Sequence, residues 1–235
     1  MIEEGSKNEF LNQDVAHFKS VPHLFKVQRM NKGYDNVSWF YDRLSRLVFG
    51  NKLHAAECYF LSAIMPADNI LIAGGGSGLI LEDITKLHPR GLSITYIDAS
   101  PKMIALAQQR NAGDNKVSFI TSPVQNIKLS SDYDLIITPF LFDNFTGQTA
   151  AEVFKHLDRS LHCNGQWLYT DFRNTGRAKH GLLLKSMYMF FGTLCGIRNS
   201  TLPDMDMLFA QHAYQLKKES SSMNGFVASM EYIKQ

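Results

Sequence analysis

The sequence is poor in the patterns that build disulfide scaffolds and metal sites. Its three cysteines, Cys58, Cys163 and Cys195, lie far apart and form no C-x-x-C pair. Its eight histidines show neither H-x-x-x-H nor H-E-x-x-H spacing. An odd number of separated thiols is typical of a reducing compartment, and zinc motifs need closely spaced ligands. We therefore expect a cytoplasmic protein without disulfides and without a bound metal.

Concentrated charge and long apolar runs are also missing. The 24 basic and 22 acidic residues nearly cancel, and the longest basic run is Lys217-Lys218. A dedicated nucleic-acid-binding face is therefore not expected, although an RNA substrate stays open. The longest apolar stretch, residues 181–197, contains Lys185 and is shorter than the roughly 20 residues of a membrane span. We expect a buried or lid helix there and no transmembrane segment. Residues 1–20 carry four acids and no apolar core, unlike a secretory signal peptide.

What is present is a regular alternation of apolar runs and helical segments. The runs that predict buried strands are residues 69–73, 93–97, 116–121, 133–138 and 166–170. The helical segments between them are residues 79–88, 101–110 and 149–162, the last closed by Cys163-Asn164-Gly165. Such alternation favours parallel pairing in a doubly wound α/β sheet. Residues 212–219 and 226–233 alternate like strands and predict a C-terminal antiparallel hairpin on that sheet.

Helical segments flank this alternation on both sides. Residues 35–48 and 52–64 carry apolar side chains at helical spacing, with a break at Gly50-Asn51. We expect residues 1–66 to form N-terminal helices on the lid or substrate side. Residues 67–235 would form the main domain, with a helical insert at about 176–209.

A cluster of glycines follows the first predicted strand. Gly74, Gly75, Gly76 and Gly78 stand where a strand ends and a helix begins. A glycine cluster alone marks a mere turn about as often as a ligand site, but this context favours a loop whose backbone approaches a ligand. A dinucleotide fingerprint, G-x-G-x-x-G, would place its third glycine where Leu79 stands. This departure disfavours a nicotinamide-dependent oxidoreductase, the least favoured of our alternatives.

Asp98 ends the second predicted strand, 20 residues after Gly78. An acid at that position is able to accept hydrogen bonds from both hydroxyls of a ribose. The alternative is that Asp98 only begins the following turn, in which Ser100 is a candidate helix N-cap and Pro101 occupies the first helical position.

Several segments together resemble a known family. Residues 70–78, 96–103 and 133–138 look like the successive motifs of class I S-adenosylmethionine-dependent methyltransferases. Residues 34–42 resemble the N-terminal helices of the quinone- and small-molecule-methylating branch. The resemblance covers about residues 34–172. It implies a Rossmann-like sheet of seven strands, the last antiparallel. It also implies S-adenosyl-L-methionine as cofactor and S-adenosyl-L-homocysteine as product.

The resemblance implies a cofactor site at the ends of successive strands. Asp98 would hold the ribose, with Ala99 and Met103 flanking the adenine. Pro123 and Val124 would cover the adenine, and residues 138–140 would lie beside the sulfonium. The full expected set is Tyr34, Gly74, Gly75, Gly76, Gly78, Asp98, Ala99, Met103, Pro123, Val124, Thr138, Pro139 and Phe140.

Two positions depart from the family pattern. Ile72 stands on strand one where the family usually has an acid, and Pro123 stands in the loop after strand three where an acid is common. The first loss removes a carboxylate that would attract the ligand's ammonium group. These departures leave open a second hypothesis, a cofactor-binding protein of the same fold with little or no activity.

Transfer of a methyl group to a phenol, enol or acidic carbon needs a base. Asp143 and Tyr41 are the candidates near the expected methyl position, while His180 and His212 are more distant ones. Asp143 is equally a candidate N-cap for a helical turn at residues 144–149.

The predicted insert at about 176–209 is rich in leucine, methionine and phenylalanine. Methionine adapts to irregular space, and ligand pockets are mostly lined by apolar side chains. We therefore expect a small or medium, partly apolar organic acceptor, with O- or C-methylation favoured over N-methylation. A homodimer stays open.

Overall fold

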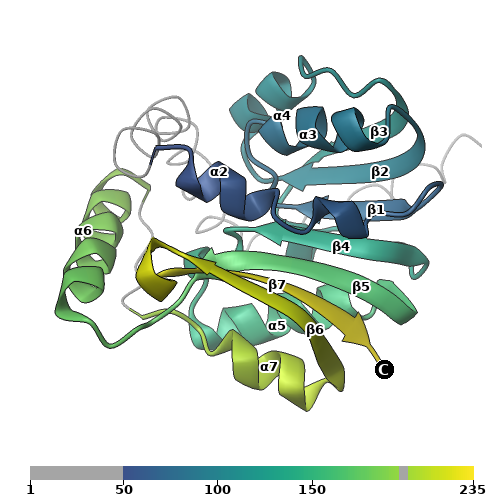
Figure 1. Cartoon of the computed structure of the whole chain (residues 1–235). Coiled ribbons are helices and arrows are strands. Elements are labelled where there is room, and N and C mark those ends of the chain that lie inside the picture. The colour runs from purple at the N-terminus through teal and green to yellow at the C-terminus, as the bar shows by residue number, and fades with distance from the viewer. Residues whose placement is uncertain (1–49, 196–200) are drawn as a thin grey trace, which may run out of the picture.

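The computed structural model describes residues 50–195 and 201–235. Within them lies a seven-stranded sheet of order β3-β2-β1-β4-β5-β7-β6 (Figure 1). Its strands are β1 (Asn69–Ala73), β2 (Arg90–Asp98), β3 (Asp114–Thr121), β4 (Tyr133–Pro139), β5 (Leu161–Phe172), β6 (Tyr214–Ser222) and β7 (Val227–Lys234). Strands β1 to β5 pair in parallel, and β7 is antiparallel to both β5 and β6. The predicted doubly wound sheet with a C-terminal antiparallel hairpin is confirmed.

Helices cover both faces of this sheet. They are α2 (Lys52–Glu57), α3 (Leu79–Leu87), α4 (Pro101–Ala107), α5 (Gly147–Asp158), α6 (Ala178–Cys195) and α7 (Met205–Gln211), with short 3-10 turns η1 (Leu61–Ala63), η2 (Val124–Asn126), η3 (Phe142–Asn144) and η4 (Met223–Gly225). α3 and α4 lie on one face, and α5 and α7 lie on the other (Figure 1). The predicted helix at 35–48, together with Tyr34 and Tyr41, lies outside the described residues.

The continuous apolar run of β1 is explained by burial on both sides. Ile70 and Ile72 join the core cluster that contains α3, while Leu71 and Ala73 join the cluster that contains α5 and α7. Successive side chains of a strand point to opposite faces, so a strand covered on both faces is apolar at every position. Helices then leave the neighbouring strands β1 and β4 toward opposite faces. Such a switch in chain direction opens a crevice at the carboxyl ends of these strands.

The expected helix at 149–162, closed at Cys163-Asn164-Gly165, is wrong in its boundaries. α5 ends at Asp158, and β5 already begins at Leu161 and contains Gly165. Asn164 has a left-handed φ of 65°, and the register of β5 against β4 shifts between Tyr133 and Leu135. The glycine therefore marks an irregularity inside a strand rather than a turn before it.

The expected helix at 52–64 is shorter than predicted. α2 ends at Glu57, and a separate 3-10 turn follows at Leu61–Ala63. The carbonyl of Ala56 accepts hydrogen bonds from Ser229 Oγ at 2.8 Å and from Thr170 Oγ1 at 3.4 Å. The same carbonyl also accepts a hydrogen bond from the backbone amide of Tyr59 at 3.3 Å, so the hydroxyls on β7 and β5 add to this local bond. They also attach α2 to the sheet.

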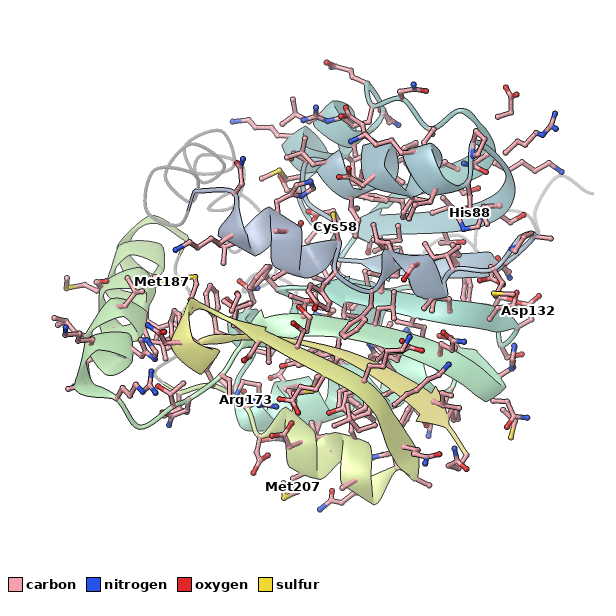
Figure 2. All side chains as sticks on the ribbon, viewed as in Figure 1. Cys58, His88, Asp132, Arg173, Met187 and Met207 are labelled. Carbon is pink, nitrogen blue, oxygen red and sulfur yellow. The ribbon has the colours of Figure 1, made fainter. Side chains whose placement is uncertain are left out.

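The helical stretch expected at 176–209 is not continuous. It contains α6 and α7, and residues 201–204 between them are not helical. Met187 on α6, labelled in Figure 2, packs against the core cluster that contains Phe172 and Phe226. None of the helices in residues 50–195 and 201–235 is long and apolar enough to cross a membrane.

Candidate functional site

The glycine bend lies between β1 and α3, at the carboxyl end of β1. Gly76 has a left-handed φ of +62°, and a Cβ built on it would meet no atom of residues 50–195 and 201–235 within 4 Å. Gly75 is different, because its Cβ would lie 2.3 Å from the hydroxyl of Tyr96. Close packing against Tyr96 therefore requires glycine at position 75, whereas the left-handed φ favours glycine at position 76. Among the described residues, none fills the space beside Gly76.

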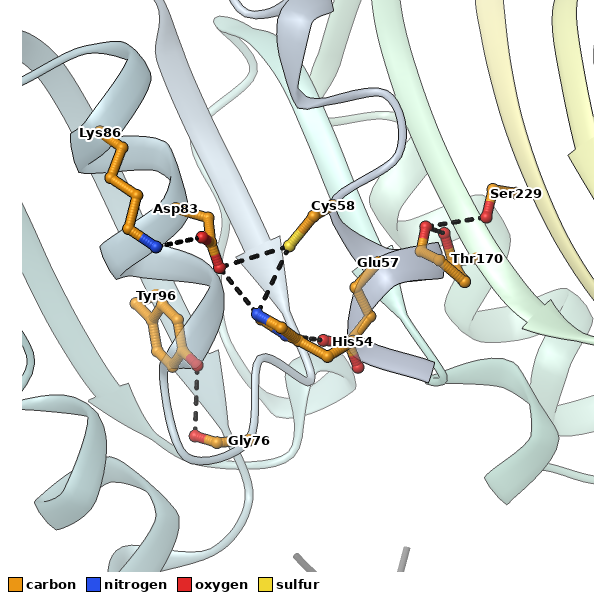
Figure 3. Close-up of polar contacts among 10 residues, drawn as sticks. His54, Glu57, Cys58, Gly76, Asp83, Lys86, Tyr96, Thr170 and Ser229 are labelled. Atoms are coloured by element: carbon orange, nitrogen blue, oxygen red, sulfur yellow. Dashed lines mark hydrogen bonds and ion pairs between the residues drawn. The ribbon is translucent and has the colours of Figure 1, made fainter. Parts of the chain in front are cut away.

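Asp98 joins the bend to the end of β2. Its Oδ2 accepts a hydrogen bond from the amide of Gly76 at 2.9 Å, and its Oδ1 accepts one from the amide of Ser100 at 2.8 Å. The hydroxyl of Tyr96 donates to the carbonyl of Gly76 at 3.2 Å (Figure 3). Two residues of β2 thus fix Gly76, and the half-buried carboxylate of Asp98 lies directly beside the bend.

The helix after Asp98 begins as the sequence predicts. Ser100 is the N-cap of α4, and its hydroxyl accepts a hydrogen bond from the amide of Met103 at 3.3 Å, with Pro101 in the first turn. Asp98 therefore does begin this turn, as the alternative interpretation held. It contacts the glycine bend at the same time, so the two interpretations are compatible. Ala99 beside it is half-buried.

The remaining residues expected to bind the cofactor differ in how deeply they are buried and in how their side chains are hydrogen-bonded. The amide of Ser122 donates to the carbonyl of Asp98 at 3.0 Å, which brings the loop after β3, with the half-buried Pro123, beside Asp98. Val124 is buried in the core cluster. Thr138 is fully buried, and its hydroxyl accepts a hydrogen bond from Trp167 Nε1 at 2.9 Å. Its side chain is thus engaged within the core.

The end of β4 carries an unusual backbone conformation. Phe140, directly after Pro139, has a left-handed φ of 46°, which is costly for a residue with a bulky side chain. Its amide donates to the carbonyl of Thr170 at 2.8 Å, and its carbonyl accepts from Asn144 Nδ2 at 3.0 Å. Its ring packs on Phe172 with the centroids 5.0 Å apart. Contacts on three sides hold this conformation, which directs the chain away from β4 at the crevice.

Two aspartates meet after this bend. Asp171 on β5 is buried, and its carboxylate accepts hydrogen bonds from the amides of Phe142 at 2.9 Å, Asp143 at 3.2 Å and Phe172 at 2.8 Å. Burial raises the pKa of Asp171 to about 7. Burial, and then the charge of Asp171, hold the pKa of Asp143 well above its usual range. Asp143 lies in η3 and does not cap α5, whose N-cap residue is Thr146, so the capping alternative is wrong.

A tyrosine of α6 belongs to the same neighbourhood. The hydroxyl of Tyr188 is buried and has no hydrogen-bond partner among the described residues. Burial, followed by the charges of Asp143 and Asp171, raises its pKa. Neither Asp171 nor this hydroxyl was predicted from the sequence. An acid at the end of the strand next to β4 was an available signal for Asp171, whereas nothing local distinguishes Tyr188 within its apolar helix.

The two more distant histidines do not converge on the aspartates. His180 Nδ1 lies 2.6 Å from Thr175 Oγ1, and His212 Nδ1 lies 2.9 Å from the carbonyl of Leu208. A cavity of about 310 Å³ opens near Asp171, between the ends of β5 and β7 and the chain that leads into α7. No residue of the glycine bend lines it.

Comparison with known proteins agrees with this geometry. Residues 71–167, which contain the glycine bend, Asp98 and Asp143, match a family model described as a methyltransferase domain. Magnesium protoporphyrin IX methyltransferase from Synechocystis PCC 6803, solved with bound S-adenosylhomocysteine, has a TM-score of 0.63 at 16% identity, covering 87% of this chain and 98% of that one. The plantazolicin methyltransferase, also solved with S-adenosylhomocysteine, has a TM-score of 0.61 at 19% identity, covering 89% and 96%. The predicted resemblance to class I S-adenosylmethionine-dependent methyltransferases is confirmed.

Part of the chain is also similar in sequence to curated O-methyltransferases. Malonyl-[acyl-carrier protein] O-methyltransferase of Anoxybacillus flavithermus is 27% identical over 154 residues, 65% of this chain and 56% of the relative. A protein of the same description from Ilyobacter polytropus is 26% identical over 153 residues, covering 64% and 54%. The chain spans about half the length of these relatives.

Proposed function

We propose that the protein transfers a methyl group from S-adenosylmethionine to a small or medium, partly apolar organic acceptor. Oxygen is the favoured acceptor atom, since the similar curated proteins are named as O-methyltransferases. The observation that carries the proposal is the 2.9 Å hydrogen bond that places the Asp98 carboxylate beside the open face of Gly76. A carbon acceptor stays a prediction of the sequence.

The residues at the bend fit an adenosine-bearing cofactor. A carboxylate has about four lone-pair positions, and two of those on Asp98 are used by the amides of Gly76 and Ser100. Two ribose hydroxyls would bind this same carboxylate. Ala99 and Met103 would flank the adenine, with Pro123 and Val124 over it. The cofactor supplies a methyl group already activated by the positive sulfonium.

The ammonium end of the cofactor would meet backbone groups of the bend. Ile72, where an acid is usual, is fully buried in the core cluster with Ile80 and Ile84. Carbonyl oxygens near Gly74 would then accept from the ammonium group in place of a carboxylate. The same observation supports the second hypothesis, a protein that binds the cofactor and transfers little.

Asp143 is our candidate for the base. Asn144 Nδ2 donates to Asp143 Oδ1 at 2.7 Å, which orients the carboxyl group. Its raised pKa makes the ionised form a stronger proton acceptor than an exposed aspartate. Asp171 is a positioning residue, because it binds the backbone amide of Asp143. The hydroxyl of Tyr188 would bind the acceptor. Tyr34 and Tyr41 stay predictions, as do the division at residue 66, a homodimer and a cytoplasmic location.

The proposal predicts transfer of labelled methyl groups from the cofactor to an organic-soluble product in a native metabolite extract. Asp143→Asn should lower the rate of transfer at least tenfold while leaving cofactor affinity unchanged, because the substitution removes the proton acceptor alone. Glu152→Gln, an exposed change on α5, is the matched control. Cofactor binding without any labelled product would support the inactive alternative. Equal rates for Asp143→Asn and wild type would remove Asp143 from the reaction.

A further inference from the structure

Three metal-binding side chains meet between α2 and α3, and the proposed reaction uses none of them. His54 lies within α2, Cys58 is the C-cap residue of α2, and Asp83 lies in the middle of α3 (Figure 3). His54 Nε2 lies 2.7 Å from Asp83 Oδ2, Cys58 Sγ lies 3.5 Å from the same oxygen, and Cys58 Sγ lies 3.8 Å from His54 Nε2. One nitrogen, one sulfur and one oxygen thus form a small triangle.

The triangle has nearly the size that a tetrahedral zinc ion requires. With ordinary zinc–ligand distances, the sulfur–nitrogen, sulfur–oxygen and nitrogen–oxygen edges are about 3.6, 3.5 and 3.3 Å. The two edges at Cys58 differ from these values by only a few tenths of an ångström at most. The edge between His54 and Asp83 must open by about 0.6 Å. A rotamer adjustment of one half-buried side chain is enough for this.

The surrounding charges orient the three ligands. Glu57 Oε2 lies 3.3 Å from His54 Nδ1, on the other side of the ring from Asp83 (Figure 3). A carboxylate there holds the proton on Nδ1 and leaves Nε2 free to bind a metal. Lys86 Nζ lies 2.6 Å from Asp83 Oδ1, so the oxygen of Asp83 that faces the cluster is the other one, Oδ2.

We propose that His54, Cys58 and Asp83 form a zinc site that fastens α2 to α3. A nitrogen, a thiolate and a carboxylate are a donor set that suits Zn²⁺ and its spectroscopic substitute Co²⁺. The three ligands leave one tetrahedral position for water. α2 is already attached to β5 and β7 through Ala56. The metal would therefore connect β5 and β7, through α2, to α3, the helix that follows the glycine bend.

Metal binding at this site should release protons to the solvent, because zinc binds a thiolate and a neutral imidazole rather than their protonated forms. The apparent affinity for the metal should therefore rise with pH. Asp83 and Lys86 complete the charged groups that face His54 and Cys58.

The test is titration of the chelator-treated full chain with Co²⁺. One equivalent should bind, with a near-ultraviolet thiolate-to-cobalt band and the strong visible bands of tetrahedral cobalt, and Zn²⁺ should displace it. Cys58→Ser should abolish the thiolate band. Cys163→Ser, which removes an exposed thiol on β5, is the matched control and should retain it. Asp83→Asn should weaken Co²⁺ binding at least tenfold and serves where Cys58→Ser does not fold.

Two results would overturn the proposal. One is the absence of saturable Co²⁺ binding at micromolar concentrations between pH 7 and pH 8.5. The other is a thiolate band that persists in folded Cys58→Ser, because another cysteine would then be the ligand. A zinc-dependent increase in the melting temperature of the wild-type chain, absent in Asp83→Asn, would support it further.

Discussion

At the scale of single residues, Asp98 has two tasks that must be separated in any experiment. It holds the glycine bend through the amide of Gly76, and in our proposal it also binds the ribose of the cofactor. A substitution at 98 therefore changes both the shape of the bend and its chemistry. Measurements of ligand affinity need a parallel measurement of stability.

Asp98→Ala should weaken binding of S-adenosylhomocysteine at least tenfold in isothermal titration calorimetry. Two hydrogen bonds to the ribose are lost, each worth about 1 kcal/mol. Asp132→Ala is the control, because Asp132 is exposed and lies far from α2 and the glycine bend (Figure 2). Circular dichroism would establish that both variants fold. An affinity for Asp98→Ala equal to that of wild type would exclude Asp98 from the site.

The neighbouring glycines should respond differently to alanine. Gly76→Ala places a methyl group in open space at a left-handed φ, so its stability should fall by about 1 kcal/mol while cofactor binding is lost. Gly75→Ala drives a methyl group into Tyr96, so its stability should fall by more, about 2–3 kcal/mol. Urea unfolding and calorimetry together separate the two effects. The idea fails if Gly76→Ala binds the cofactor normally.

The proposed zinc ligands show why a site of this kind escapes sequence reasoning. His54 and Cys58 are four residues apart and therefore share one face of a helix, but a search for histidine pairs passes over them. The third ligand, Asp83, lies 25 residues beyond Cys58. It comes into contact only because α2 packs beside α3. The cofactor residues are more predictable, since they follow the ends of recognisable strands.

At the scale of elements, the junction of β4 and β5 depends on a buried acid. Asp171 binds three backbone amides and so fixes the chain between Phe140 and α5. Burial raises its pKa to about 7, above the roughly 3.9 of an unfolded chain. The folded protein therefore binds more protons than the unfolded one between these two values. The contribution of Asp171 to the free energy of unfolding should therefore decrease as pH rises from about 4 to about 7.

Asp171→Asn should flatten this dependence. Urea unfolding at pH 5 and at pH 8 should show a smaller loss of stability in the variant, by at least about 1 kcal/mol, since one pKa unit corresponds to about 1.4 kcal/mol. The variant should also be less stable at pH 5, because an amide replaces an acceptor of three backbone amides. Parallel pH curves for wild type and variant would contradict the raised pKa.

Element types were easier to predict than their boundaries. The apolar runs identify the buried strands because both faces of the sheet are covered. Asn164-Gly165 is typical of a turn, yet pairing with β4 keeps it inside β5. Near the end of α2, the carbonyl of Ala56 likewise binds Ser229, more than 170 residues away along the chain. Local patterns contain no information about such distant partners.

At the scale of the whole molecule, the sheet places the proposed cofactor residues and the proposed acceptor residues at the carboxyl ends of its parallel strands. The bend after β1 and Asp98 after β2 form the cofactor side, and the ends of β4 and β5 contribute Asp143 and Asp171. α2 and α6 lie on the side of the molecule where these strands end (Figure 1). The sequence predicts this arrangement because parallel strands share the direction of their carboxyl ends. It does not predict which side chains of α6 face the acids.

The central claim is that the carboxylate of Asp98 and the open face of Gly76 together hold an adenosine-bearing cofactor. The most direct measurement is a crystal structure of the full chain soaked with S-adenosylhomocysteine. We expect both ribose hydroxyls within hydrogen-bond distance of Asp98 and the ligand lying across Gly76, with its sulfur directed toward the end of β4. A ligand bound elsewhere, or a ribose out of reach of Asp98, would contradict the account.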